Sequence, residues 1–323
     1  MMYFPTFNQR AMTRTIVSPF VLVAALAALV SGCSSSKKQP ASPPHKIAEI
    51  DSLSSPEALS FDAAQNVYFI SNVNGTPGVK DGNGFISRVT ADGVMDSLHF
   101  IQGGRDSVTL DSPMGSRVQG DTLWVVDVDK LRGFNTHTGA PLTVVDFAPF
   151  NAHFLNDLAI DSTGEFYITD TGVQAGADGK MTHPGPDRIF RVARDRTVTI
   201  ALSTSFLSSP DGIDFDRRAR RFVLAPFAGN AVQEWRSADP GPTDVAKGKG
   251  LFDGVEVEPN GTILITSWND SSVSTLEGPK LVPRISNLPY PPADVSMDVG
   301  RSRVGIVSLA NNRFELWEWP FTK

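Results

Sequence analysis

The sequence contains a single cysteine, Cys33, which excludes intramolecular disulfides. It has no run of basic residues, and its net charge of −6 argues against nucleic acid or anionic lipid as a partner. No G-x-S-x-G motif is present, so a serine nucleophile of the common hydrolase type is not indicated. After the N-terminal region, no stretch sustains the 3.6-residue periodicity of an amphipathic helix.

The N-terminal region has the features of a targeting signal. Arg10 and Arg14 precede a segment of 15 mostly apolar residues, 16–30. This is shorter than the roughly 20 residues of a membrane-spanning helix, but it suits the hydrophobic part of a signal peptide. We therefore expect residues 1–32 to be removed as a signal peptide, and translation can start at Met1 or at Met12.

The residues around Cys33 predict a lipid anchor. The sequence "VSGC", residues 30–33, resembles the lipobox of bacterial lipoproteins, in which the cysteine is acylated. The alternative is an ordinary cleaved signal with an incidental cysteine. Residues 33–45 combine Cys33 with "SSSKKQPASPPH", which has almost no apolar residues to bury and is typical of a flexible tether. We expect an envelope lipoprotein, on the periplasmic side or the cell surface, that touches the membrane only through its anchor.

The 278 residues from 46 to 323 predict one all-β domain. Short runs rich in β-branched and aromatic residues alternate with Gly, Asp, Asn and Pro. The runs repeat a template of a polar or small residue, a short apolar strand, a turn and a stronger strand. Examples are "FLNDLAIDSTGEFYITD", "SSPDGIDFDRRARRFVLA" and "LFDGVEVEPNGTILITS".

Six copies of this template predict a six-bladed β-propeller of four-stranded blades. The residues that begin the first strand of each copy, here called the head residues, recur every 40 to 57 residues, and a propeller blade takes ~40 to 50. The chain ends one strand short of a blade, so we expect residues 46–53 to complete the last blade and close the ring. The head residues are Glu57, Met114, Asn156, Asp211, Asp253 and Ala293.

The head residues predict a metal site. First strands line the central channel of a propeller, so the head residues should form a ring at one mouth, and Glu57, Asp211 and Asp253 would repel one another without a cation. With the Asn156 amide they offer only oxygen ligands, which suits Ca²⁺, although another divalent metal is possible. The alternative is that these residues only shape turns, the role expected of four aspartates that follow the same strands. Those aspartates are Asp62, Asp161, Asp216 and Asp298.

These motifs resemble the family of regucalcin (senescence marker protein), gluconolactonase and luciferin-regenerating enzyme. "SPEAL", "NDLAID", "GEFYITDTG", "SPDGIDFD" and "FDGVEVEPNGTILITSW" together cover nearly all of residues 46–323. The resemblance implies a six-bladed, calcium-dependent propeller that hydrolyses lactones. It also implies metal ligation by Glu57, Asp211 and Asp253, with Asn156 contacting the metal or the substrate, and Asp253 as the base. The predicted catalytic residues are therefore Asp253 and Asn156.

Two substitutions at the mouth depart from the family pattern. Phe154 stands where sugar-lactone members have arginine, and Asp211 stands where asparagine is commoner and adds a negative charge. Met114 stands where the related paraoxonases have histidine. An apolar mouth of this kind favours a hydrophobic lactone or ester. His153 and the insertion of residues 171–188, with His183, are further candidates for substrate contact, although a solvated histidine and a surface loop are the alternatives.

Three function classes fit the sequence. The first is a calcium-dependent lactonase or esterase acting on a small molecule. The second is a non-enzymatic envelope propeller that binds a ligand or a protein partner and uses Ca²⁺ structurally. The third is a different enzyme, such as a lyase, on the same scaffold, since propellers host many activities. We expect a monomer in each case.

Overall fold

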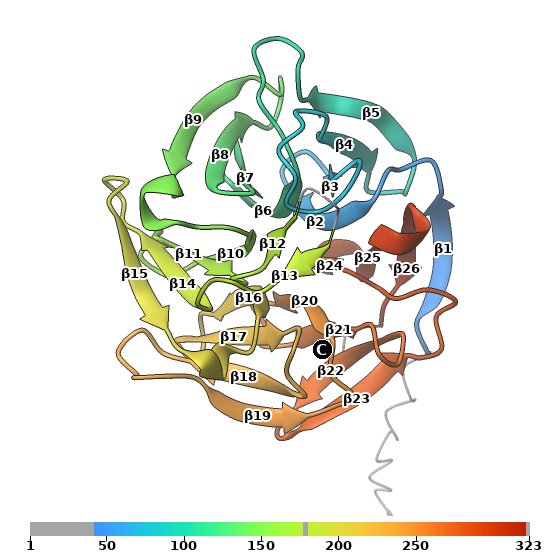
Figure 1. Cartoon of the computed structure of the whole chain (residues 1–323). Helices are drawn as coiled ribbons and strands as arrows, with labels where there is room; N and C mark the ends of the chain where they lie inside the picture. The colour runs from blue at the N-terminus through green and yellow to red at the C-terminus, as the bar shows by residue number, and fades with distance from the viewer. Residues whose placement is uncertain (1–41, 177–179, 321–323) are drawn as a thin grey trace, which may run out of the picture. The chain divides into compact units, whose positions relative to one another are not determined.

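The computed structural model describes residues 42–176 and 180–320. The predicted signal peptide, Cys33 and most of the tether lie outside the described residues. Regular structure in the described part is β, apart from short 3₁₀ helices, so the all-β prediction is confirmed (Figure 1). Those helices are η1 (Ala148–Phe150), η2 (Ser205–Leu207), η3 (Val299–Arg301) and η4 (Leu309–Asn311). No helix among the described residues has the length and apolar character needed to cross a bilayer.

The strands form consecutive antiparallel sets of four around a common axis, which is a propeller architecture (Figure 1). The first set is β2 (Pro56–Asp62), β3 (Val67–Asn72), β4 (Phe85–Thr90) and β5 (Met95–Gln102). The second is β6 (Pro113–Gln119), β7 (Thr122–Asp127), β8 (Lys130–Asn135) and β9 (Pro141–Asp146). The third is β10 (Leu155–Ile160), β11 (Phe166–Asp170), β14 (Arg188–Val192) and β15 (Val198–Ser203).

The next two sets are joined into one eight-stranded sheet. A single parallel pairing, Lys247 with Lys280, connects their outermost strands, β19 and β23. The sequence template did not indicate this contact, which lies between the outer edges of neighbouring blades. One set is β16 (Pro210–Asp216), β17 (Arg221–Pro226), β18 (Ala231–Trp235) and β19 (Thr243–Lys247). The other is β20 (Phe252–Val257), β21 (Ile263–Ser267), β22 (Ser272–Glu277) and β23 (Lys280–Ile285).

The N-terminal strand closes the ring, as predicted. β1 (His45–Ile50) pairs antiparallel with β26 (Arg313–Glu318), which continues to β25 (Arg303–Ser308) and β24 (Val295–Asp298). The last set therefore takes one strand from the start of the chain and three from its end. This pairing satisfies the backbone edge that β26 would otherwise expose at the seam.

Apolar side chains form the core between neighbouring sets. One cluster joins Leu59 and Tyr68 of the first set to Val307 and Phe314 of the last set, all of them buried. Similar clusters lie between the other adjacent sheets, because the alternating apolar side chains of each face meet those of the next sheet. The core thus runs around the ring and leaves the axis to polar residues.

The turn aspartates behave as predicted. Asp62, Asp161 and Asp216 each accept hydrogen bonds from two backbone N–H groups in the turn that follows, at 2.7–3.1 Å. Asp298 accepts one from Arg301 at 3.1 Å. Side-chain oxygens that replace missing backbone partners are the usual reason for aspartate in tight turns. Their role is therefore separate from that of the head residues.

Candidate metal centre

Three head residues converge at one end of the inner strands. Glu57, Asp211 and Asp253 are each the second residue of an inner strand, β2, β16 and β20. Their carboxyl groups offer one oxygen each within 4.8 Å of one another, and all three residues are buried. In β2 and β16 the preceding residue is proline, which tolerates the first position of a strand because no ladder hydrogen bond is needed there.

A cavity of about 10 Å³ lies between these carboxyl groups. This volume is close to the minimum that holds one water molecule, so it also suits a single ion. Asn156 of β10 lines the same cavity. Glu57 Oε2 is buried and has no hydrogen-bond partner among the residues that the structure describes, which marks an acceptor that lacks a donor or a cation.

Burial and mutual repulsion disfavour the charged forms of the three carboxyl groups. Burial is the largest cause that raises the pKa of Glu57, Asp211 and Asp253 well above their ordinary values. The charge of Asp253 raises the pKa values of Glu57 and Asp211 further, while the Asn156 side chain partly offsets the shift at Asp211. A divalent cation between the carboxylates would remove this penalty. The donor set therefore fits a metal ion.

Two more carboxyl groups, not predicted from the sequence, lie directly below the head residues. Asp157 and Asp294 line the same cavity, and burial raises their pKa values to about 6 and about 7. Glycines make room for them. A Cβ atom at Gly115 would lie 2.4 Å from Asp157 Oδ1, and one at Gly254 would lie 2.5 Å from Asp294 Oδ1.

These two aspartates also join neighbouring inner strands. Asp157 Oδ2 accepts a hydrogen bond from the backbone N–H of Ile213 at 2.9 Å, and Asp294 Oδ2 accepts one from Leu59 at 3.1 Å. The edge of an inner strand that faces the channel has backbone N–H groups without a partner strand. A side-chain carboxylate from the neighbouring set accepts a hydrogen bond from such a group. Asp214 does the same for Val257 at 2.7 Å.

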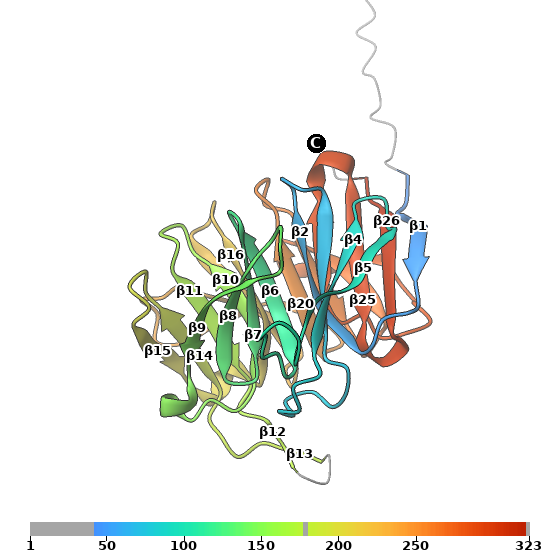
Figure 2. The same cartoon turned by 90° about the horizontal axis from the view of Figure 1, so that it is seen from above.

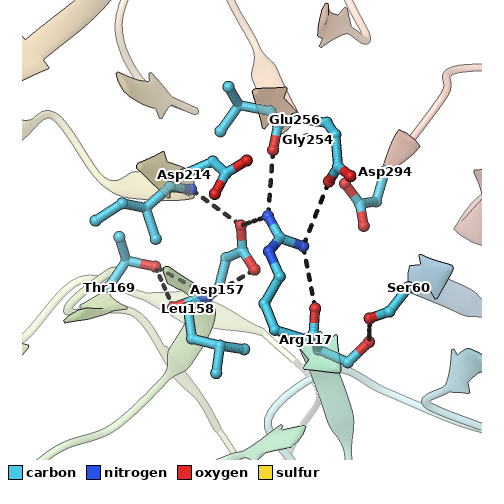
Figure 3. A network of polar contacts seen from close by, with 12 residues as sticks. Ser60, Arg117, Asp157, Leu158, Thr169, Asp214, Gly254, Glu256 and Asp294 are labelled. Carbon is cyan, nitrogen blue, oxygen red and sulfur yellow. Dashed lines mark hydrogen bonds and ion pairs between the residues drawn. The ribbon is translucent and has the colours of Figure 1, made fainter. Parts of the chain in front are cut away.

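A largely buried arginine, Arg117, occupies the channel beneath this layer. Figure 3 shows the Arg117 side chain among Asp157, Asp214, Glu256 and Asp294. Arg117 Nη2 lies 3.8 Å from Asp157 Oδ2, and Nη1 lies 3.7 Å from Glu256 Oε2. Burial favours the neutral guanidine, but these carboxylates outweigh it and raise the pKa of Arg117. The arginine is thus a fixed cation of the channel.

The predicted substrate-contact residues are placed as follows. Met114 and Phe154 are buried in one apolar cluster between the second and third sets, and the Phe154 ring lies against Gly78. His153 is half-buried beside Gly185. His183 is exposed, and its Nε2 lies 2.7 Å from Asp187 Oδ1. Since no substrate is present, their role in binding stays a prediction.

The insertion 171–188 leaves the third set at the metal-site end. It follows Asp170, which pairs with Leu155, the neighbour of Asn156. Its described part forms a hairpin of β12 (Gln174–Ala175) and β13 (Met181–Thr182). The hairpin lies near the middle of the ring in Figure 1 and at one end of the sheets in Figure 2. A contact between the insertion and a substrate stays a prediction.

The metal-free protein is expected to lose stability as the pH rises. The folded-state pKa values of Glu57, Asp211 and Asp253 are raised above the unfolded values of about 4. The folded state then binds more protons, so its stability is greatest at acidic pH and falls as the pH passes through the raised pKa values. The melting temperature with chelator should therefore be lower at pH 8 than at pH 5. Saturating Ca²⁺ should remove most of this fall, and equal pH trends with and without Ca²⁺ would contradict the site.

The fold and the acidic channel mouth together define a class: propellers with a candidate metal centre on the axis. The sequence matches no protein-family model and no curated protein. Among solved structures, a gluconolactonase from Xanthomonas campestris is similar, with a TM-score of 0.66 and 18% identity over 86% of this chain and 89% of that one. A luciferin-regenerating enzyme is similar with a TM-score of 0.63 and 11% identity, over 85% of this chain and 94% of that one. A chain of a nidogen/laminin complex is similar with a TM-score of 0.53 and 18% identity, over 69% of this chain and 75% of that one.

The first two likenesses match the family that the sequence motifs resemble, and at these identities they establish the fold. The chain has the propeller fold of gluconolactonase and luciferin-regenerating enzyme. The third likeness shows that similar propellers also occur in a protein–protein complex.

Proposed function

We propose that this protein is a calcium-dependent hydrolase of a lactone or a related ester. The observation that carries the proposal is the convergence of Glu57, Asp211 and Asp253 on one small cavity at the channel mouth. The likeness to a gluconolactonase supports the same reaction class. Membership of the gluconolactonase family is part of this proposal.

The donor set favours Ca²⁺ over softer metals. Glu57, Asp211 and Asp253 would hold the ion through carboxylate oxygens, and Asn156 would add an amide oxygen. Ca²⁺ takes six to eight oxygen ligands in irregular geometry, whereas Zn²⁺ sites usually include nitrogen or sulfur. Mg²⁺ and Mn²⁺ are the nearest alternatives.

The residues of the site can support ester hydrolysis. When bound, the cation supplies Lewis-acid polarisation of the substrate carbonyl. Asp253 would accept the proton of the attacking water, because its carboxylate faces the cavity in which the water would be bound. Asn156 would orient the carbonyl through its side-chain amide. Met114 and Phe154 would favour an apolar substrate.

Hydrolysis of a substrate panel tests the proposal. We expect the purified protein to hydrolyse at least one member of a set of aliphatic, aromatic and sugar lactones and aryl esters. Activity should be lost with chelator and restored by Ca²⁺. Turnover that persists in chelator would contradict the metal-dependent reaction, and its restoration by Mg²⁺ or Mn²⁺ but not Ca²⁺ would correct the ion.

A binding propeller with a structural Ca²⁺ is the second candidate. The metal cavity of about 10 Å³ has the size of a single ion, as a structural metal site requires. The nidogen/laminin likeness also places this architecture in a protein complex. Ca²⁺ that raises the melting temperature without turnover on any member of the panel would favour this candidate.

The cellular setting remains part of the proposal. We propose a monomeric envelope lipoprotein, anchored through acylated Cys33 and exposed on the periplasmic side or at the cell surface. The substrate would then be a small lactone or ester outside the cytoplasm, and the membrane would contact only the anchor.

A further inference from the structure

A second cavity, of about 160 Å³, lies at the far end of the inner strands from the metal centre. Glu258 lines it and directly follows β20, five residues after Asp253. At ~3.3 Å per strand residue, the two are about 16 Å apart along the strand. The polar lining residues are Arg117, Asp214, Arg217, Arg218 and Glu258.

Glu258 differs from its counterparts in the other repeats. It stands where Asp62, Asp161, Asp216 and Asp298 accept hydrogen bonds from the following turn. Here the turn is held by backbone bonds and by the side chain of Asn260, which accepts from Thr262 N–H at 2.7 Å. The Glu258 carboxyl is therefore not needed for the turn.

The Glu258 carboxyl has no hydrogen-bond partner in the described part of the chain. Glu258 is only 3% exposed, and its Oε1 and Oε2 each have less than 1 Å² of exposed area and no hydrogen bond among residues 42–176 and 180–320. A ligand in the cavity would reach this carboxyl once the side chain turns toward it. Burial raises its pKa to about 7. An unsatisfied buried carboxyl destabilises the fold, so its presence calls for a ligand that donates a hydrogen bond.

Two cations lie at the rim of the same cavity. Arg217 and Arg218 are exposed, and each donates to a backbone carbonyl, of Ile160 at 3.4 Å and of Asn260 respectively. Within residues 42–176 and 180–320, no carboxylate lies within 4.0 Å of either guanidinium. A guanidinium has five N–H donors, so most remain available to an anion.

The other carboxylate that lines the cavity, that of Asp214, is already engaged. It accepts from the backbone N–H groups of Phe215 and Val257, both at 2.7 Å. Glu256 does not line the cavity and is within ion-pair distance of Arg117. The unsatisfied groups are therefore one buried acceptor, Glu258, and the donors of Arg217 and Arg218.

We propose that this cavity is a second binding site, for a small hydroxycarboxylate. The ligand carboxylate would contact Arg217 and Arg218, and its hydroxyl would donate to the Glu258 carboxylate after that side chain turns toward the cavity. Its volume of about 160 Å³ accommodates an acid of a few carbon atoms. The site does not depend on the hydrolase proposal, although opening a lactone ring also yields a hydroxycarboxylate.

Calorimetric titration of the full-length protein tests the site. Lactate is the probe, and propionate, which lacks the hydroxyl, is the matched control ligand. Titrations are done with chelator and repeated in Asp253→Asn, so that capture at the metal centre is excluded. We expect lactate to bind at least tenfold more tightly than propionate, because only lactate satisfies Glu258.

Variants separate a binding role from a structural one. Glu258→Leu should weaken lactate binding at least tenfold. It should not lower the melting temperature, because it removes an unsatisfied group. The double variant Arg217→Gln/Arg218→Gln should also weaken lactate binding tenfold. Arg220 lies in the same turn but does not line the cavity, so Arg220→Gln should leave lactate binding unchanged. If Glu258→Leu fails to fold, Glu258→Gln replaces it.

Three results would overturn the site: no lactate binding at millimolar concentration, equal binding of lactate and propionate, or unchanged binding in the variants. Each leaves the hydrolase proposal intact, because that proposal is judged by calcium-dependent turnover. Conversely, lactate binding in chelator by a protein without turnover would support this site while the hydrolase proposal fails.

Discussion

Asp253→Asn is expected to lower calcium-dependent hydrolysis by about 10²- to 10⁴-fold, the range for loss of a general base. The substitution keeps the shape of the side chain but removes the group that accepts the water proton. It also removes one of the three carboxylates that converge on the cavity. Initial rates on the best panel substrate, at saturating Ca²⁺, measure the effect.

The same variant should be more stable than the wild type in chelator at neutral pH. Each of the three carboxylates raises the energy of the others when no cation is bound, so removing one relieves repulsion. Melting temperatures with and without Ca²⁺ check this, and the gain should vanish or reverse when Ca²⁺ is present. A variant that loses activity because it unfolds would instead melt lower in both conditions.

Asp121→Asn is the matched control for this experiment. Its side chain is 82% exposed. Asp121 lies in the turn between β6 and β7 and does not line the metal cavity. It should change neither the rate nor the calcium dependence of stability. Hydrolysis by Asp253→Asn within a few-fold of the wild type would remove Asp253 from the reaction, whatever its part in binding the metal.

Much of the fold could be predicted from the sequence because each blade repeats the same local signals. Alternating apolar residues and turn residues identify the strands, and the incomplete last repeat predicts that the chain start pairs with its end. The pairing of β1 with β26 confirms this. The pairing of Lys247 with Lys280 was not predictable, because a single contact between outer edges leaves no pattern in the sequence.

The second layer of the channel was missed for a definable reason. Strict alternation from Glu57 or Asp253 turns the next residue away from the channel. The pairing register shifts just after the first residues of β2, β6, β10, β16 and β20, as in a β-bulge. Such a shift breaks the alternation, so that residues one and three positions after a head residue face the channel.

The sequence did contain the signal for this layer. The residues one position after the heads include Asp157 and Asp294, and those three positions after include Arg117, Asp214 and Glu256. Polar residues recurring at a fixed template position, within strands that otherwise bury apolar side chains, indicate a second polar layer. Glu258 was detectable in the same way, as the one glutamate at a position where four repeats have aspartate.

Arg117→Met is expected to destabilise the fold by about 3–5 kcal/mol, the cost of removing one partner from a buried ion pair. Arg117 is the cation that Asp157 and Glu256 contact, and its side chain is only 14% exposed. Its guanidinium also donates to the backbone carbonyls of Ser116 and Val255 at 3.0 and 3.3 Å, so the two sides of the channel would lose a direct link. Denaturant unfolding at pH 7.5 in saturating Ca²⁺ measures the loss.

An exposed ion pair provides the control. Arg191→Met removes a guanidinium that contacts Glu165 at 2.6 Å but is 38% exposed, on β14, the third strand of its set. Water compensates for such a loss, so the expected cost is about 1 kcal/mol or less. Similar losses for the two variants would mean that the channel arginine is as well solvated as a surface residue.

The pH dependence of the Arg117→Met loss distinguishes charge from packing. Without the arginine, the folded-state pKa values of Asp157 and Asp294 should rise further, because Arg117 lowers both. The folded state then holds more protons than the unfolded state over a wider range, so the deficit should grow from pH 5 to pH 8. Adding Glu256→Gln should recover part of it, since one uncompensated carboxylate is removed. A deficit that is constant with pH and unaffected by Glu256→Gln would mean that Arg117 acts by filling space, and that the carboxylates of the metal centre need no second cation below them.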